Sequence, residues 1–236
     1  MNEIQFYPLG DAAITVRLGT SADIAVHNKV RGLVKYLEDH PLPGMIELVP
    51  GFTTVTVFYD PMELLCLGQA TQPYEQIRAA LERILVNSYM VSEEPSVITI
   101  PVCYGGEFGP DLQEVAEFTG MTPEEVIGLH ARRSYTVYMI GFAPGFPYLG
   151  GMSEKLAVPR RSSPRLVIAA GSVGIGGKQT GIYPLESPGG WQIIGRTPLR
   201  LFNPHREQPS LLQAGDIIRF QPIPQEEYEA WGRRAE

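Results

Sequence analysis

Cysteine is scarce in this chain of 236 residues, and the two cysteines that occur, Cys66 and Cys103, exclude two common architectures. They lie far apart and neither belongs to a CxxC pair, so the sequence supports neither a disulfide framework nor a zinc site. No HExxH motif is formed by the four scattered histidines, which are His27, His40, His130 and His205. We therefore expect the protein to hold no metal.

Positive charge and long apolar runs are also in short supply. The chain carries 19 Lys and Arg residues against 26 Asp and Glu residues, a formal net charge of −7. This balance argues against nucleic acid as a general partner, because phosphate binding needs a basic surface. No run approaches the roughly 18 apolar residues that span a bilayer, so we expect no membrane partner. The first residues, MNEIQFYPLG, do not have the pattern of a signal peptide, which makes the cytoplasm the expected compartment.

The first hundred residues alternate between strand and helix signals. Apolar residues that recur with a period of 3.6 predict one helix that Ser21 caps and that ends before Pro41, and a second helix from about Pro73. Alternating or β-rich segments predict strands over residues 14–18, 46–49, 53–59 and 97–102. The resulting order, β-α-β-β-α-β, is that of a ferredoxin-like split βαβ sandwich.

The second half of the chain has a different texture. Two short helices are expected first, one after Pro110 that ends at Gly120 and one that begins at a capping box of Thr122 and Glu125. Beyond Ser134, short β segments are interrupted by Gly and Pro every few residues, which is typical of an antiparallel barrel or sandwich. We predict an α+β protein with one domain over residues 1–92 and a β-barrel domain over residues 93–236.

Two loops in the second half are rich in both rings and turn residues. Residues 141–151 contain three aromatic rings, two prolines and four glycines, and residues 171–191 have the same character. Proline and glycine make such segments poor helices or central strands, so they read as rigid loops that carry rings. They predict a shaped recognition surface that includes Phe142 and Tyr148. Tight turns with buried aromatic side chains are equally compatible with this pattern.

Several polar residues near these loops are candidates for chemistry. His130 lies on the inward side of its helix and titrates near neutrality, so it could act as an acid or base, or simply anchor the helix to the barrel. Arg160 and Arg165 flank a proline-stiffened segment that suits recognition of a carboxylate or phosphate, although surface arginines are the alternative. Gln179 and Thr180, close to Tyr183 in sequence, suit a small-molecule pocket or a protein contact.

Long irregular motifs along almost the whole chain resemble those of one family. They include residues 8–13, 101–106, 109–112, 141–150, 159–161, 164–165, 170–174, 179–184, 188–191 and 215–216. These motifs are similar to those of the family of 5-oxoprolinase B subunits, also labelled allophanate hydrolase subunit 1, which includes a Kip-type inhibitor of a sporulation histidine kinase. The resemblance implies a ferredoxin-like amino-terminal domain and a cyclophilin-like β-barrel.

The resemblance also implies an activity and partners. Members work with the C-type and A-type subunits of 5-oxoprolinase in the ATP-dependent opening of 5-oxo-L-proline, a small lactam, to L-glutamate, and the ATP is bound by or shared with a partner. The alternative is an inhibitor whose barrel docks on a sensor histidine kinase. Within the matching motifs, the expected catalytic residues are His130, Arg165 and Gln179. The expected substrate-binding residues are Phe142, Tyr148, Arg160, Thr180 and Tyr183.

Overall fold

The chain forms two compact units, residues 1–94 and 95–236, in a computed structural model. The structure describes residues 4–21, 23–66, 71–86 and 95–232. The boundary expected between residues 92 and 93 falls in 87–94, outside the described residues. Each unit has its own hydrophobic core, and each is described by itself below.

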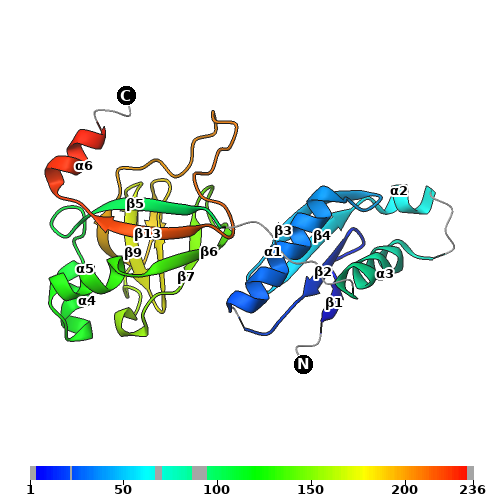
Figure 1. Ribbon diagram of the computed structural model, residues 1–236, viewed down its shortest axis with the longest axis horizontal. Helices are drawn as coiled ribbons and strands as arrows, with labels where there is room; N and C mark the ends of the chain where they lie inside the picture. Colours follow the sequence, from blue (N-terminus) through cyan, green and yellow to red (C-terminus); the bar gives the residue numbers. More distant parts are fainter. Residues whose placement is uncertain (1–3, 22, 67–70, 87–94, 233–236) are drawn as a thin grey trace. The chain divides into compact units, whose positions relative to one another are not determined.

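The first unit is a four-stranded sheet with helices on one face (Figure 1). Helix α1 packs on β3 and β4, and helix α3 packs on β2. The buried side chains of the inner sheet face, such as Ile14 and Val57, meet Leu33 of α1 and Leu81 of α3. The elements of this unit are β1 (Gln5–Pro8), β2 (Ala13–Arg17), α1 (Ile24–Asp39), β3 (Met45–Pro50), β4 (Thr54–Tyr59), α2 (Pro61–Cys66) and α3 (Pro73–Val86).

One strand of the first unit differs from the expectation. The sheet has the order β1-β2-β4-β3 and is antiparallel throughout. The segment 97–102, expected as the last strand of this sandwich, belongs instead to the barrel, and its place beside β2 is taken by β1. A four-residue edge strand that ends in Pro8 has too little alternation to be recognised in the sequence. Helix α1 also starts later than expected, because Asp23 rather than Ser21 caps it by accepting a hydrogen bond from the Val26 amide.

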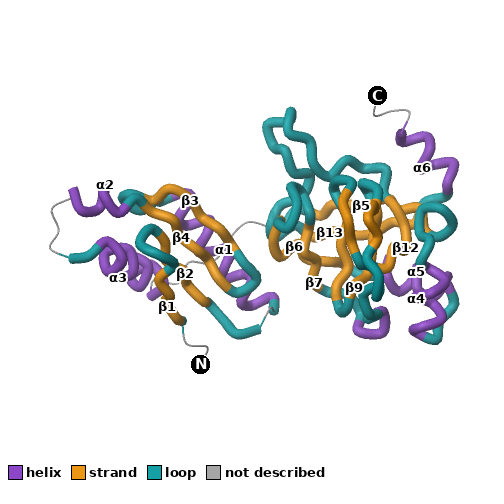
Figure 2. Tube along the Cα trace, turned by 180° about the vertical axis from the view of Figure 1, so that it is seen from behind, coloured by secondary structure: helices purple, strands orange, loops and turns teal. Residues whose placement is uncertain are grey.

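The second unit contains a closed barrel of seven strands in the order β10-β7-β6-β13-β5-β12-β9 (Figure 2). The predicted α+β class with a carboxyl-terminal barrel is confirmed. Strands β8 and β11 form a separate two-stranded ribbon. The elements are β5 (Val97–Tyr104), α4 (Leu112–Thr119), α5 (Pro123–Ala131), β6 (Ser134–Ile140), β7 (Pro147–Gly150), η1 (Glu154–Leu156), β8 (Arg165–Ile168), β9 (Ser172–Gly176), β10 (Gln179–Ile182), β11 (Ser187–Gly189), β12 (Gln192–Arg196), β13 (Ile217–Pro222) and α6 (Gln225–Gly232).

The barrel departs from a purely antiparallel design at one seam. Strand β13 pairs in parallel with β5, with Ile217 opposite Val97, whereas the other strand pairs of the barrel are antiparallel. The two short helices are as predicted: α4 ends at Gly120 in the left-handed conformation, and α5 begins at the full capping box of Thr122 and Glu125. Among the described residues, no helix has the length and apolar character needed to cross a bilayer.

Candidate active site

Trp191 lies on the outer face of the β9–β10 hairpin, where glycines provide a floor without side chains. A Cβ atom on Gly176 would lie 2.6 Å from Cδ1 and Nε1 of the indole, and one on Gly181 would lie 3.1 Å from Cζ3. Gly174 meets the Trp191 Cβ in the same way. These glycines therefore let a large ring approach the strand backbone closely, which no other residue type would allow.

Phe146 is the centre of a ring cluster beside Trp191. Its buried ring makes edge contacts with centroid distances of 5.2 Å to Tyr148, 5.7 Å to Tyr183 and 5.8 Å to Trp191. Edge-to-face geometry at these distances is the favoured arrangement of aromatic pairs. The aromatic cluster, defined as Phe142, Phe146, Tyr148, Tyr183 and Trp191, thus gathers rings from both loops that the sequence singled out.

Phe142 stands at the exposed end of the aromatic cluster on a strained backbone. Its φ is +66°, and the Ala143 amide donates to the Gly141 carbonyl across it, which describes the rare γ-turn with a positive central φ. Its ring is 70% exposed and touches Phe146 at a centroid distance of 5.4 Å. A bulky residue in this conformation costs roughly 1–3 kcal/mol and is characteristic of functional sites.

Arg160 and Gln179 supply polar groups at the aromatic cluster. The guanidinium carbon of Arg160 lies 5.9 Å from the centre of the Trp191 ring, a cation–π arrangement. The register places Gln179 opposite Gly176, so the Gln179 side chain leaves the hairpin on the same face as Trp191. Burial raises the pKa of the nearby Tyr183, which therefore stays a neutral phenol. The arrangement combines a cation, an amide and ring faces.

Arg165 is engaged within the protein by Asp111, a nearly buried carboxylate at the start of α4. Arg165 donates from Nη1 to Oδ2 at 2.7 Å and from Nη2 to Oδ1 at 2.6 Å. Arg161 donates to Oδ1 at 3.0 Å, and the Ile193 amide donates to Oδ2 at 2.6 Å. The hydrogen bonds to Asp111 raise the pKa of Arg165 further above its usual value. This charged cluster adjoins the aromatic cluster through Ile193, which packs with Phe146 and Trp191.

His130 and Thr180 face the interior of the barrel. Thr180 donates its hydroxyl to the Gly174 carbonyl at 3.0 Å, so its oxygen accepts from His130 Nε2 at 2.9 Å. His130 Nδ1 then accepts from the Tyr104 hydroxyl at 2.8 Å. Burial lowers the pKa of His130 to about 3, so the ring is neutral. Both ring nitrogens are thus satisfied, which is the arrangement of an anchoring histidine.

The structure therefore divides the expected site residues into three groups. Phe142, Tyr148, Tyr183 and Arg160 come together in or on the aromatic cluster, with Gln179 on the same face. Arg165 lies beside it, paired with Asp111, whereas His130 and Thr180 are enclosed within the barrel. Sequence reasoning did not assign a role to Asp111, although its motif stands among those of the resemblance.

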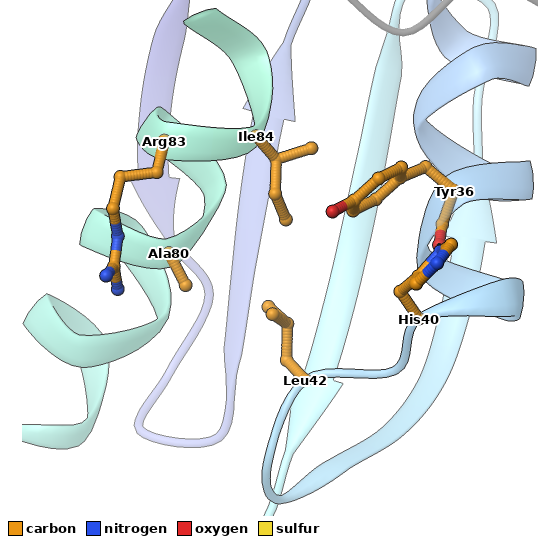
Figure 3. A pocket seen from close by; sticks show the side chains of 6 residues that line it. All are labelled: Tyr36, His40, Leu42, Ala80, Arg83 and Ile84. Atoms are coloured by element: carbon orange, nitrogen blue, oxygen red, sulfur yellow. The ribbon is translucent and has the colours of Figure 1, made fainter. Parts of the chain in front are cut away.

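A groove of about 340 Å³ lies in the first unit, and none of the candidate site residues lines it (Figure 3). It runs between α1 and α3, with Tyr36 and His40 on one side and Arg83 and Ile84 on the other. The described residues contain no group of His, Cys, Asp and Glu that could hold a metal ion.

Comparison with known proteins gives a consistent picture. Residues 4–212 match the family described as carboxyltransferase domain, subdomain C and D. The chain is 50% identical over 232 residues to the B subunit of 5-oxoprolinase from Bacillus subtilis (strain 168), covering 96% of each chain. It is 42% identical to the B subunit of 5-oxoprolinase from Escherichia coli O157:H7, covering 96% of this chain and 99% of that one.

A solved structure agrees with the sequence relatives. The crystal structure of TTHA0988 superposes with a TM-score of 0.75 at 36% identity, covering 89% of this chain and 40% of that chain. The family match spans most of the sequence, and the two bacterial relatives align over nearly their whole length. The chain belongs to the family of 5-oxoprolinase B subunits, within the carboxyltransferase subdomain C and D family.

Proposed function

We propose that this chain is the B subunit of an ATP-dependent 5-oxoprolinase that opens 5-oxo-L-proline to L-glutamate together with A-type and C-type subunits. The relatives that share 42–50% of its residues are named as the B subunit of 5-oxoprolinase. Those names favour the enzyme over the kinase-inhibitor alternative. The observation that carries the site is the position of Arg160 above Trp191, a buried ring of the aromatic cluster whose member Phe142 is exposed.

The chemistry of the substrate matches the groups at the aromatic cluster. 5-Oxo-L-proline is a small five-membered ring with one carboxylate and one lactam carbonyl. The faces of Phe142 and Tyr148 suit the ring, and a guanidinium suits the carboxylate. Of the two arginines that the sequence offers for a carboxylate, Arg165 already donates from both terminal nitrogens to Asp111, so we assign the carboxylate of the substrate to Arg160.

Gln179 is the candidate donor to the reacting carbonyl. Transfer of the terminal phosphoryl group of ATP to the lactam oxygen releases ADP and makes the ring carbon open to attack by water. The C–N bond then breaks with its electron pair going to the nitrogen, which takes up the protons of that water, and a second water hydrolyses the resulting acyl phosphate to glutamate and phosphate. A fixed amide donor stabilises the negative charge of the phosphoryl oxygens carried by the activated lactam, and the Gln179 side chain leaves the hairpin on the face that holds Trp191. The proposal gives His130 and Thr180 a structural role, because their polar atoms are paired inside the barrel.

The nucleotide is assigned to another polypeptide of the complex. The glycine-rich segment that precedes Gln179 is a hairpin turn between β9 and β10, not a loop that opens a helix. Its only cation, Lys178, is paired with Glu154 at 3.0 Å. This segment therefore lacks the helix amino terminus that a phosphate-binding loop requires.

Glutamate release from 5-oxo-L-proline and ATP, measured with the A-type and C-type subunits in the presence and absence of this chain, tests the activity. Arg160→Ala should lower kcat/KM by about tenfold to hundredfold, because a charge-assisted contact of about 1.5–3 kcal/mol is lost. The matched control is Arg219→Ala. This exposed arginine lies on β13, the strand that is across the closed barrel from β9 and β10. An Arg160→Ala complex that assembles and turns over like the Arg219→Ala complex would refute the assigned role.

A further inference from the structure

A short segment beside the aromatic cluster, residues 158–161, is fixed at both of its ends. At one end Val158 pairs with Gly177 at the tip of the β9–β10 hairpin, and the Gly177 amide donates to the Val158 carbonyl at 2.8 Å. At the other end the Arg161 amide donates to the Gly190 carbonyl at 2.7 Å. We call this segment the strap, because its two middle residues are held between fixed ends.

The middle of the strap consists of Pro159 and Arg160. The guanidinium carbon of Arg160 lies 5.9 Å from the centre of the Trp191 ring. Gln192, the residue that follows Trp191, donates from Nε2 to the Pro159 carbonyl at 3.4 Å. That carbonyl belongs to the planar peptide that joins Pro159 to Arg160, so holding it fixes where the Arg160 side chain starts. Gln192 thereby ties the middle of the strap to β12.

The amide of Gln192 is not explained by stability. Its Oε1 atom is buried and has no hydrogen-bond partner among the described residues. The register places Gln192 opposite Ile175, a core residue of the barrel, so an apolar side chain would suit this position. A buried acceptor without a partner lowers the stability of a fold, and one long hydrogen bond from the same amide offsets that cost only in part. The amide is better explained by the position that it gives to Arg160.

We propose that Gln192 is a positioning residue, which holds the strap so that the guanidinium of Arg160 stays above Trp191 and meets the substrate carboxylate in a fixed orientation. This inference deepens the proposed function and rests on it for the ligand, a small cyclic carboxylate. A guanidinium that is already oriented loses less side-chain freedom when it binds, so its contact with the carboxylate is stronger. Gln192 acts through Arg160 and touches no reacting atom.

The position of Arg160 can be measured without substrate, through the emission of Trp191. Trp231→Phe leaves Trp191 as the only indole of the chain. In that background Arg160→Ala removes the cation from the ring and should shift the emission maximum. Gln192→Leu should shift it in the same direction, and should cause no further shift when it is added to Arg160→Ala, because Gln192 acts through Arg160. Gln221→Leu, on an exposed glutamine of β13, is the matched control and should leave the emission unchanged.

Turnover by the complete complex gives a second readout. Gln192→Leu should raise the KM for 5-oxo-L-proline by about two- to tenfold, the factor that one neutral hydrogen bond contributes. The kcat and the KM for ATP should hold, because the carboxylate contact is made equally in the bound substrate and in the transition state. The thermal unfolding midpoint should stay equal or rise, since the variant removes a buried oxygen that has no partner among the described residues.

An unchanged emission in the Gln192→Leu protein, or a shift of equal size in the Arg160→Ala background, would overturn the inference. A lower unfolding midpoint with an unchanged KM would also overturn it, because that result indicates a purely structural role. If the complex with the original chain releases no glutamate, the proposed function fails. The emission of the single and double variants then still decides whether Gln192 positions Arg160.

Discussion

Asp111 is a single residue on which three segments of the second unit depend. Its carboxylate accepts hydrogen bonds from Arg161, Arg165 and the Ile193 amide, and its own amide donates to the Ile193 carbonyl at 2.9 Å. It thereby ties the start of α4 to β8 and β12. A carboxylate so placed fixes the direction of both arginines before any substrate or partner arrives.

Asp111→Asn should destabilise the second unit by about 2 kcal/mol, less than the loss of a fully buried ion pair because both arginines are partly exposed. The measurement is urea unfolding followed by circular dichroism. Glu114→Gln is the matched control, because Glu114 is 62% exposed and meets Arg161 at 3.4 Å, so its change should lie within about 0.5 kcal/mol. Equal unfolding midpoints for the two variants would contradict the role given to Asp111.

The ring-bearing residues of the site could be found from the sequence, but their polar partners could not. Loops rich in proline, glycine and aromatic residues identified Phe142, Tyr148 and Tyr183, which do gather in one cluster. Adjacent residues Gln179 and Thr180 point to opposite faces of β10. The glycines around them remove the apolar alternation that would show in the sequence which face is inward. The pairing of Arg165 with Asp111 joins residues far apart in sequence, which no local pattern reveals.

At the scale of elements, the β9–β10 hairpin is buried on both faces. Strand β9 is buried at all five residues, because the barrel core covers one face and Trp191 and Ile193 cover the other. Its sequence, SVGIG, therefore lacks the alternation that marks a half-buried strand. The hairpin also fixes the position of Trp191, because the indole ring can lie against the strand backbone only where glycines leave no side chain in the way.

Gly176→Ala should displace the Trp191 ring from the backbone of β9, because the new methyl group would overlap the indole. We expect the second unit to lose about 1–3 kcal/mol of stability, the usual effect of overpacking. Indole fluorescence during unfolding measures both effects when Trp231, the second tryptophan, is replaced by phenylalanine. Gly128→Ala in α5 is the control, since a Cβ there meets only Arg132 Nη2 at 3.9 Å and alanine favours a helix, so stability should hold or rise. A Gly176→Ala protein with the original fluorescence and midpoint would show that the close approach is not required.

Elements that are long and periodic were predictable, whereas pairings between distant strands were not. Helices α1 and α3, the capping box of α5 and the barrel follow from periodicity and turn residues. The assignment of 97–102 to the first sheet was wrong, because a strand signal does not say which partner a strand will find. The edge strand β1 was missed for the same reason: its partner β2 defines it, not its own four residues.

For the whole molecule, each unit contains one buried histidine that resists protonation. Burial lowers the pKa of His27 to about 4 in the first unit and that of His130 to about 3 in the second. Below pH 6.5 the unfolded chain binds protons at these positions that the folded units do not. The contribution of these histidines to the free energy of unfolding should therefore be fully present above pH 6.5. It should decrease as the pH falls toward 4, by at most about 1.4 kcal/mol per pH unit for each histidine.

His130→Gln should flatten this pH dependence for the second unit, because the replacement cannot take up a proton. Thermal unfolding at pH 7.5, 6 and 5 measures the slope, and His205→Gln, on an exposed histidine, should keep the original slope. A His130→Gln variant whose stability declines with acid as steeply as that of the His205→Gln variant would contradict the proposed protonation state.

The parallel seam between β5 and β13 decides when the barrel can close. Strand β5, the first of the second unit, cannot complete its pairing until β13, the last, has been synthesised, since Val97 pairs with Ile217. At about 5–20 residues per second, a ribosome needs on the order of ten seconds to add the intervening chain. During that interval the first unit is already complete, while both edges of β5 lack partners until β12 is made and the edge that pairs with β13 lacks one to the end. Nascent chains of this protein should therefore engage chaperones at the second unit and not at the first.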